Sequence, residues 1–236
     1  MWFEEVTKFS RMANEAQNKL NPEKWPLLPV KPVALAEPAK EFIIQMIDDE
    51  MDELVEAKDL VEQADALLDI IYYVLDTGAK HGMELRFDTS RCQTHPPLTD
   101  LYDVPMSFKK DIAHCLNNLV KSDDVIDHAL ALIEVCEVCI STADNMGVDL
   151  NPIFDIVQGA NMAKFVDGVV VLDTDVTSKR YGKVQKPIGW TAPDSKIKEE
   201  ISRQGITIDY GNQDPDEWIK EQRRLAEEKR NTDNGL

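Results

Sequence analysis

Hydrophobic residues recur every three or four positions along most of this chain, which is the spacing of one face of an α-helix. Gly82 and Gly147 are expected to end two of the helices, while Asn151 and Pro152 suit the N-cap and first position of another. The pattern predicts helices over residues 1–20, 39–58, 60–81, 107–121, 124–146 and 151–165. The predicted fold class is therefore all-α.

Proline and glycine interrupt the helical pattern in several places. The proline-rich residues 21–38 predict an extended connection, and residues 88–106 predict a loop. Loop or short-strand pieces follow between residues 168 and 193. The remaining tail predicts a short helix, a strand-like ITIDY segment and a charged helix near its end. We expect one domain over residues 1–193 and a helical C-terminal extension over residues 194–236.

The chain contains a weak internal repeat. Residues 42–85 align without gaps on residues 107–150, and the identical positions include Asp59 with Asp124 and Gly82 with Gly147. Two unrelated pairs of amphipathic helices of similar length would also align in part, so chance similarity is an open alternative. The favoured interpretation is a duplicated helical hairpin that forms a four-helix-bundle core. The catalytic hairpin would be 39–82, and the degenerate repeat 107–147.

Two acid pairs stand at helical spacing in the first hairpin. Glu50 and Glu53 form one pair, Glu62 and Asp65 form the other, and Asp69 follows one turn later. Helical projection places Glu50 inside the apolar stripe of its helix and Glu53 at the edge of that stripe. The second hairpin has lost most of the corresponding acids, so we expect one complete metal site per chain.

No lysine or arginine lies between Lys58 and Lys80 to neutralise the acids of the second helix. A solvated acidic face is the ordinary alternative in so acidic a chain. Close carboxylates repel one another unless a cation lies among them, and oxygen ligands suit Mg²⁺ or Mn²⁺. The pattern therefore favours a metal-dependent enzyme that acts on a phosphate substrate.

Composition narrows the partners and the compartment. The formal net charge of −18 argues against nonspecific binding to nucleic acid or to acidic membranes, because both require a basic surface. The longest apolar run, residues 70–75, is too short to cross a bilayer, and the first ten residues do not form a secretory signal. The four cysteines do not suggest a secreted disulfide framework. We expect a cytoplasmic protein without nucleic-acid or membrane partners.

The acid pairs resemble the signature of the all-α nucleoside triphosphate pyrophosphohydrolases. This MazG-like superfamily also includes phosphoribosyl-ATP pyrophosphohydrolases and dimeric dUTPases. Its E-E-x-x-E helix reads here Asp49-Glu50-Met51-Asp52-Glu53, and its E-x-x-D helix reads Glu62-Gln63-Ala64-Asp65. Asp49 thus replaces the first glutamate. Residues 160–168 and 182–194 also resemble the segment that follows the helical core in several members.

The resemblance implies hydrolysis of a nucleoside triphosphate to the monophosphate and pyrophosphate, with Mg²⁺ as cofactor and Mn²⁺ as a substitute. The implied metal ligands are Glu50, Glu53, Glu62 and Asp65. Asp49 or Glu53 would orient or deprotonate the attacking water. The implied substrate-binding residues are Asp69, Tyr73, Asn161, Lys164, Lys183, Lys186 and Trp190.

Larger relatives with two helical units often act on pyrimidine deoxynucleoside triphosphates. The resemblance therefore makes house-cleaning of the nucleotide pool the expected role, and a homodimer the expected assembly. A function of another class stays open, because the second hairpin is degenerate and the tail is charged. In that alternative the chain is a catalytically silent helical module that binds a nucleotide or a partner protein.

Overall fold

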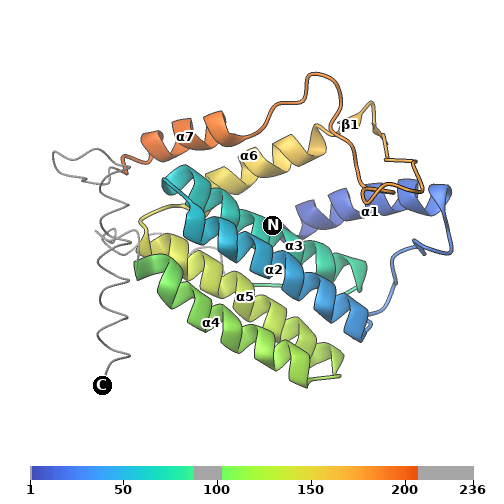
Figure 1. Cartoon of the computed structure of the whole chain (residues 1–236), viewed down its shortest axis with the longest axis horizontal. Helices are drawn as coiled ribbons and strands as arrows, with labels where there is room; N and C mark the ends of the chain where they lie inside the picture. The colour runs from blue at the N-terminus through green and yellow to red at the C-terminus, as the bar shows by residue number, and fades with distance from the viewer. Residues whose placement is uncertain (1, 88–102, 207–236) are drawn as a thin grey trace.

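The computed structural model describes residues 2–87 and 103–206, and it is mainly helical (Figure 1). Strands β1 (Phe165–Val166) and β2 (Val169–Val170) pair antiparallel between the last two helices. The helices are α1 (Trp2–Leu20), α2 (Glu37–Glu56), α3 (Leu60–Lys80), α4 (Asp103–Lys121), α5 (Val125–Asn145), α6 (Leu150–Met162) and α7 (Asp194–Arg203). The predicted all-α class is confirmed.

Helices α2 to α5 form the predicted bundle. Helix α2 packs against α3 and α4, and α5 packs against the same two helices, so the two hairpins lie side by side (Figure 1). Helix α3 also contacts α1, α6 and α7, which lie on the other side of it. It is therefore the central element of the described fold.

The second helices of the two hairpins, α3 and α5, begin with the same kind of N-cap and end at the same kind of glycine turn. Asp59 and Asp124 occupy the N-caps of α3 and α5, and each side chain accepts hydrogen bonds from the backbone two and three residues ahead. Gly82 and Gly147 follow these helices with φ values of 65° and 74°. After each glycine, a backbone N–H donates to a helix carbonyl five residues earlier at 2.9 Å. The shared caps support a duplicated hairpin.

Two predicted helix starts are corrected. Helix α4 begins at Asp103 rather than at residue 107, because Pro105 falls in the first turn, where a missing N–H breaks no helical bond. Helix α6 has Asp149 as its N-cap rather than Asn151, whose backbone N–H donates to the Asp149 carboxylate at 2.9 Å. Most of the predicted loop at 88–106 and of the ITIDY segment, and the charged helix of the tail, lie outside the described residues.

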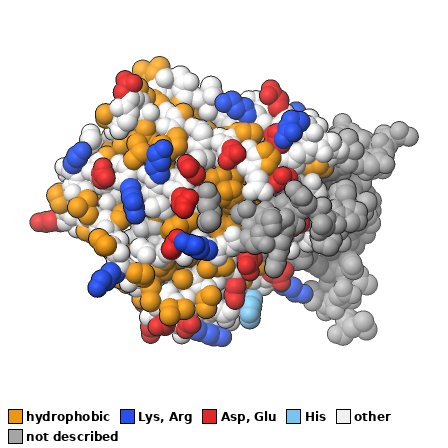
Figure 2. All heavy atoms as spheres, turned by 180° about the vertical axis from the view of Figure 1, so that it is seen from behind, with side chains coloured by type: hydrophobic (Ala, Val, Ile, Leu, Met, Phe, Trp, Pro, Cys, Tyr) orange, Lys and Arg blue, Asp and Glu red, His pale blue; other side chains and the backbone are white. Residues whose placement is uncertain are grey.

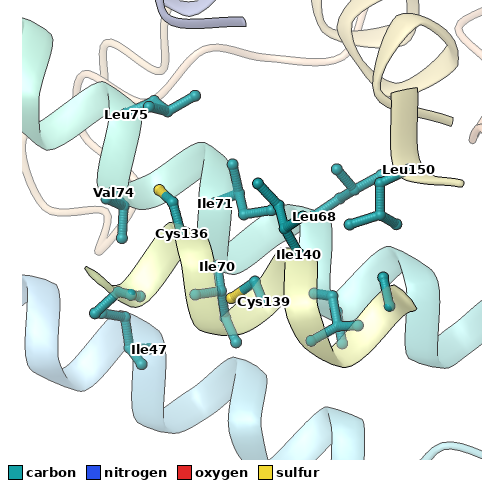
Figure 3. Packing of buried hydrophobic residues seen from close by; sticks show 14 of the residues in the cluster. Ile47, Leu68, Ile70, Ile71, Val74, Leu75, Cys136, Cys139, Ile140 and Leu150 are labelled. Atoms are coloured by element: carbon teal, nitrogen blue, oxygen red, sulfur yellow. The ribbon is translucent and has the colours of Figure 1, made fainter. Parts of the chain in front are cut away.

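One hydrophobic core joins the two hairpins to α6 (Figure 3). Helix α3 contributes Leu68, Ile71 and Leu75, which are buried together with residues of α2 and α5. Cys136 and Cys139 of α5 are fully buried in this core, and burial raises the pKa of both thiols. Both cysteines are therefore packing residues rather than nucleophiles.

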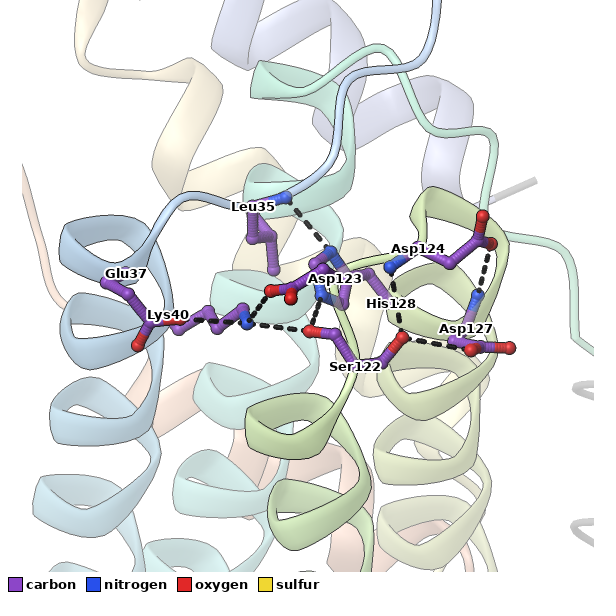
Figure 4. Close-up of polar contacts among 8 residues, drawn as sticks. All are labelled: Leu35, Glu37, Lys40, Ser122, Asp123, Asp124, Asp127 and His128. Carbon is purple, nitrogen blue, oxygen red and sulfur yellow. Dashed lines mark hydrogen bonds and ion pairs between the residues drawn. The ribbon is translucent and has the colours of Figure 1, made fainter.

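A buried polar network fixes the proline-rich connection to the second hairpin (Figure 4). The Leu35 backbone N–H donates to Nδ1 of His128 at 3.0 Å, so the proton of the neutral ring lies on Nε2. That Nε2 donates to the Ser122 carbonyl at 2.7 Å, and Nζ of Lys40 donates to the same carbonyl at 2.6 Å. The network holds the start of α2 against the turn between α4 and α5.

Charged side chains of both signs are interspersed with hydrophobic ones on the described part of the rear face (Figure 2). Lysine and arginine do not gather there into one basic area. In the described part of the chain, no helix combines the length and hydrophobicity needed to cross a bilayer.

Replacing His128 with leucine should lower the free energy of unfolding by about 1–3 kcal/mol, because the buried Leu35 N–H loses its acceptor. Urea denaturation followed by circular dichroism measures the change. The matched control is His114→Leu on the exposed side of α4, which should change stability by less than about 0.5 kcal/mol. Equal effects of the two substitutions would refute the structural role of His128.

Candidate active site

Most of the predicted site residues meet at one cavity of about 370 Å³. It lies between α3, α6 and the segment that leads into α7. The predicted residues that line it are Asp65, Asp69, Tyr73, Asn161, Lys164, Lys186 and Trp190. The 65–73 stretch and the 161–190 stretch are far apart in sequence, so the fold brings together the two segments that carried the family resemblance.

The acids of α2 and α3 form a mutually repelling group beside this cavity. Glu50 is buried, and its Oε2 atom has no hydrogen-bond partner within residues 2–87 and 103–206. Burial, followed by repulsion from Asp69, Glu53 and Asp65, raises the pKa of Glu50 to about 8. Helical spacing thus turns Glu50 inward toward the acids of α3, as its place in the apolar stripe predicts.

The two aspartates of α3 are perturbed in the same direction. Burial, followed by repulsion from Asp65, raises the pKa of Asp69 to about 7, although Lys164 and Lys186 oppose the shift. Burial, followed by repulsion from Asp194, raises the pKa of Asp65 to about 6. Glu50 and Asp69 therefore retain protons near neutral pH that separate carboxylates would have released.

The donor set suits a divalent cation. Among the described residues, no group of three or more histidine, cysteine or acidic side chains is arranged in a way that could hold a metal ion. The chemistry nevertheless fits, because no described residue forms a hydrogen bond with the buried Oε2 of Glu50, and repulsion from Asp69, Glu53 and Asp65 adds to the rise in its pKa. A cation among them would relieve this repulsion, and carboxylate oxygens are the ligands that Mg²⁺ prefers. Binding it requires these side chains to turn toward one another.

Five predicted residues do not line the cavity: Glu50 and Glu53 belong to the acidic group beside it, and the other three lie apart. The Glu62 carboxylate accepts a hydrogen bond from the Lys58 backbone N–H at 2.6 Å and so ties the turn before α3 to the first turn of that helix. Asp49 is exposed, and its carboxylate accepts a hydrogen bond from Nε2 of Gln45 at 2.6 Å. Lys183 is exposed and does not line the cavity.

A cationic wall faces the acids across the cavity. Nζ of Lys186 lies 4.2 Å from the centroid of the Trp190 ring, and Nζ of Lys164 lies 5.7 Å from it. The Trp190 indole N–H donates to the Ala160 carbonyl at 2.8 Å, which anchors the ring to α6. Burial and the neighbouring Lys186 lower the pKa of Lys164, while Asp69 opposes the shift. The cavity therefore has an acidic side and a basic side.

Phe9, Asp76 and Asp194 also line the cavity, and sequence reasoning did not assign them to the site. Asp76 continues the acidic arc of α3, and it accepts a hydrogen bond from the Ser10 hydroxyl of α1 at 2.6 Å. Asp194 is the last residue of the segment 182–194, which resembles the region that follows the helical core in several family members. This resemblance could therefore have identified Asp194 from the sequence. Phe9 packs edge to face on Tyr72, with ring centroids 5.8 Å apart. Nothing local in the sequence predicts that contact.

A larger hollow of about 920 Å³ lies between α1, residues 27–30 and the end of α3. Its lining contains Lys8 and Arg11 together with three glutamates. None of the predicted site residues lines it, so the smaller cavity is the candidate active site.

Comparison with known proteins identifies the class of the first hairpin. Residues 30–87 match the family model of phosphoribosyl-ATP pyrophosphohydrolase, and this range contains α2, α3 and both acid pairs. The predicted resemblance to the all-α nucleoside triphosphate pyrophosphohydrolase superfamily is confirmed over this segment. Searches of curated proteins and of solved structures gave no match.

The matched family consists of nucleotide pyrophosphohydrolases, which are hydrolases that act on acid anhydrides. The match therefore supports pyrophosphohydrolase activity on nucleotide triphosphates in general. Enzymes of this family generally depend on a divalent cation. The oxygen donors beside the cavity agree with that requirement.

The metal-free protein should lose stability as the pH rises from about 4.5 to about 8. Over that range the folded protein keeps a proton on Glu50 that the unfolded chain has released, so raising the pH favours unfolding. Glu50→Gln removes this penalty and should raise the melting temperature near pH 8 by about 2–4 °C, with little change near pH 4.5. Thermal melts in the presence of a chelator measure the difference.

The control for this substitution is Glu56→Gln on the exposed face of the same helix. It should leave the melting temperature unchanged at both pH values. A wild-type stability that is flat or rises between pH 4.5 and 8 would contradict the raised pKa of Glu50.

Proposed function

We propose that this chain hydrolyses a nucleoside triphosphate to the monophosphate and pyrophosphate in a Mg²⁺-dependent reaction. The leading substrate is a pyrimidine deoxynucleoside triphosphate, and the role is house-cleaning of the cytoplasmic nucleotide pool. One observation carries the proposal: Asp65 and Asp69 line the same cavity as Lys164 and Lys186. A polyphosphate bound to a divalent cation would suit this cavity, because the aspartates attract the cation and the lysines attract the phosphates.

The side chains have separable tasks in this reaction. Lys164 and Lys186 stabilise the negative charge of the phosphates. Mg²⁺ held by Glu50, Glu53 and Asp65 would offset further phosphate charge and lower the pKa of an attacking water. We propose Glu62 as a further metal ligand. Its carboxylate would first have to give up the hydrogen bond that it accepts from the Lys58 backbone N–H.

The base for the attacking water is Glu53 or Asp49, and the structure favours Glu53. Repulsion from Glu53 contributes to the raised pKa of Glu50, Asp65 and Asp69, so its carboxylate is close to all three. Asp49 affects only Glu50 among these three and is bonded to Gln45. Glu53 is also exposed, so water reaches it.

The nucleoside would lie toward Trp190, Tyr73 and Asn161. Trp190 offers a flat ring that α6 holds in place, while Asp69 and Asn161 offer hydrogen-bonding groups to base or sugar. Lys183 would need a change of the loop to reach the phosphates. Because the matched family is named for phosphoribosyl-ATP, that compound is the second substrate to test. We also propose a homodimer, which light scattering would detect as twice the mass of the 26.7 kDa chain.

Incubation of the purified protein with each canonical and oxidised deoxynucleoside triphosphate, and with phosphoribosyl-ATP, tests the activity. We expect monophosphate and pyrophosphate as products, fastest from a pyrimidine nucleotide, and no turnover after chelation of Mg²⁺. Chromatography that resolves the products and a pyrophosphate assay provide the measurement. Release of orthophosphate alone would contradict the proposal. Binding without turnover of any nucleotide would favour the catalytically silent module.

Asp65→Asn should lower kcat/KM by about 100-fold or more while leaving the fold intact, because it removes one charge from the cation site. The matched control is Asp52→Asn, whose exposed carboxylate pairs with Nζ of Lys109 at 3.2 Å outside the cavity. The control should retain activity within about twofold. Comparable losses in both variants would show that the cavity is not the site of reaction.

A further inference from the structure

A chain of hydrogen bonds leads from the backbone of α1 to the cationic wall of the cavity. Nε2 of Gln158 donates to the Glu5 carbonyl at 2.9 Å, and the Tyr72 hydroxyl donates to Oε1 of Gln158 at 2.9 Å. Burial raises the pKa of the Tyr72 hydroxyl, and a hydrogen-bonding interaction with the Asn161 side chain, which lines the same cavity, opposes this rise. Nζ of Lys164 then donates to Oδ1 of Asn161 at 2.6 Å. These contacts connect α1, α3 and α6.

The direction of every bond in this chain is fixed by its first member. The Glu5 carbonyl only accepts, so Gln158 must turn its amide nitrogen toward it and its oxygen toward Tyr72. The Tyr72 hydroxyl therefore donates to Gln158, and its oxygen is left to accept from the amide nitrogen of Asn161. This leaves the oxygen of Asn161 for the Lys164 ammonium group, which carries only donors.

The alternative orientation of Asn161 would be unfavourable. If the amide flipped, its nitrogen would face the Lys164 ammonium group, and two donors would meet without an acceptor between them. The Tyr72 hydroxyl adds a second penalty, because a flipped amide would turn its oxygen toward a phenol oxygen whose proton is donated to Gln158. Gln158 is buried and Tyr72 is half-buried, so these bonds are shielded from competing water.

The position of Lys164 matters because a lysine side chain is long and flexible. Its ammonium group otherwise loses side-chain entropy when it contacts a phosphate. The bond to Asn161 holds it in advance on the cavity wall beside Trp190. An anion that enters the cavity then meets an ammonium group already in place.

We propose that Tyr72 and Gln158 are positioning residues, which hold Asn161 and through it the Lys164 ammonium group for binding of the substrate's phosphates. This inference rests on the proposed function, because it takes Lys164 as a phosphate contact. It gives α1 a second role at the site besides the Phe9 side chain that lines the cavity, since the Glu5 carbonyl anchors the whole chain of bonds.

Tyr72→Phe removes the hydroxyl with little change of shape. It should weaken the binding of inorganic pyrophosphate in the presence of Mg²⁺ by about three- to tenfold, the effect of one hydrogen bond. The KM for the nucleotide should rise by a similar factor, while kcat changes by less than about twofold, because the phosphate contact is made in ground and transition states alike. Isothermal titration calorimetry and steady-state kinetics measure the two effects.

A double-mutant cycle separates positioning from a merely structural role. If Tyr72 acts through Lys164, adding Tyr72→Phe to Lys164→Met should weaken pyrophosphate binding no further. If the hydroxyl only supports the fold, the loss will be the same in both backgrounds, and the proposal is overturned. Gln158→Met interrupts the same chain of bonds at another residue and should weaken pyrophosphate binding by a similar factor. It therefore tests the proposal independently if Tyr72→Phe folds poorly.

The control variant is Tyr181→Phe, which removes a hydroxyl from a half-buried tyrosine that packs on Trp25 outside the cavity. It should leave pyrophosphate binding unchanged. Pyrophosphate binding does not require turnover, so the two proposals fail separately. A protein that hydrolyses no nucleotide but shows the expected cycle refutes the proposed function alone. Unchanged binding by Tyr72→Phe, or no binding by the wild type, refutes the positioning role.

Discussion

Helix α3 is buried on nearly every side, and the rest of the structure is arranged around this constraint. Helices α1, α2, α5, α6 and α7 all pack against it, because apolar residues occupy most of its circumference. Its few acidic residues must then emerge where the surrounding helices leave an opening. Asp65, Asp69 and Asp76 emerge at one cavity, which is therefore a consequence of how α3 is packed.

Burial of these acids has an energetic cost that packing alone does not explain. Carboxylates in a partly desolvated group repel one another, and burial together with this repulsion raises the pKa of Glu50, Asp65 and Asp69. In the part of the chain that the structure describes, the buried Oε2 of Glu50 has no hydrogen-bond partner, so its charged form is costly there. Such local instability is typical of sites that bind a cation or perform chemistry. The lysines across the cavity offset part of the charge, and the same lysines suit a phosphate substrate.

The second hairpin, α4 and α5, has the same helical arrangement as the first but lacks most of its acids. Cys115, Asn118 and Leu130 stand where the first hairpin has Glu50, Glu53 and Asp65. Cys115 is buried in the core, which agrees with the inward direction of Glu50 at the equivalent position. The caps and turns of the two hairpins still correspond. The degenerate hairpin thus completes the bundle within one chain, while the first hairpin carries the acids.

The sequence by itself determined the helices, the glycines that end two of them and the inward direction of Glu50. These features depend on residues three to five positions apart, and such spacings can be read from the chain. Resemblance to a family added Asn161, Lys164, Lys186 and Trp190, which local spacing would not have selected.

Only the tertiary structure decided which of these residues meet. It placed Asp194 beside Asp65, turned Glu62 toward the Lys58 backbone N–H, and left Lys183 outside the cavity. It also brought Glu5 to Gln158, two residues that are 153 positions apart. No periodic pattern encodes such contacts, because they depend on how whole helices pack against α3 rather than on the residues next to them in the chain.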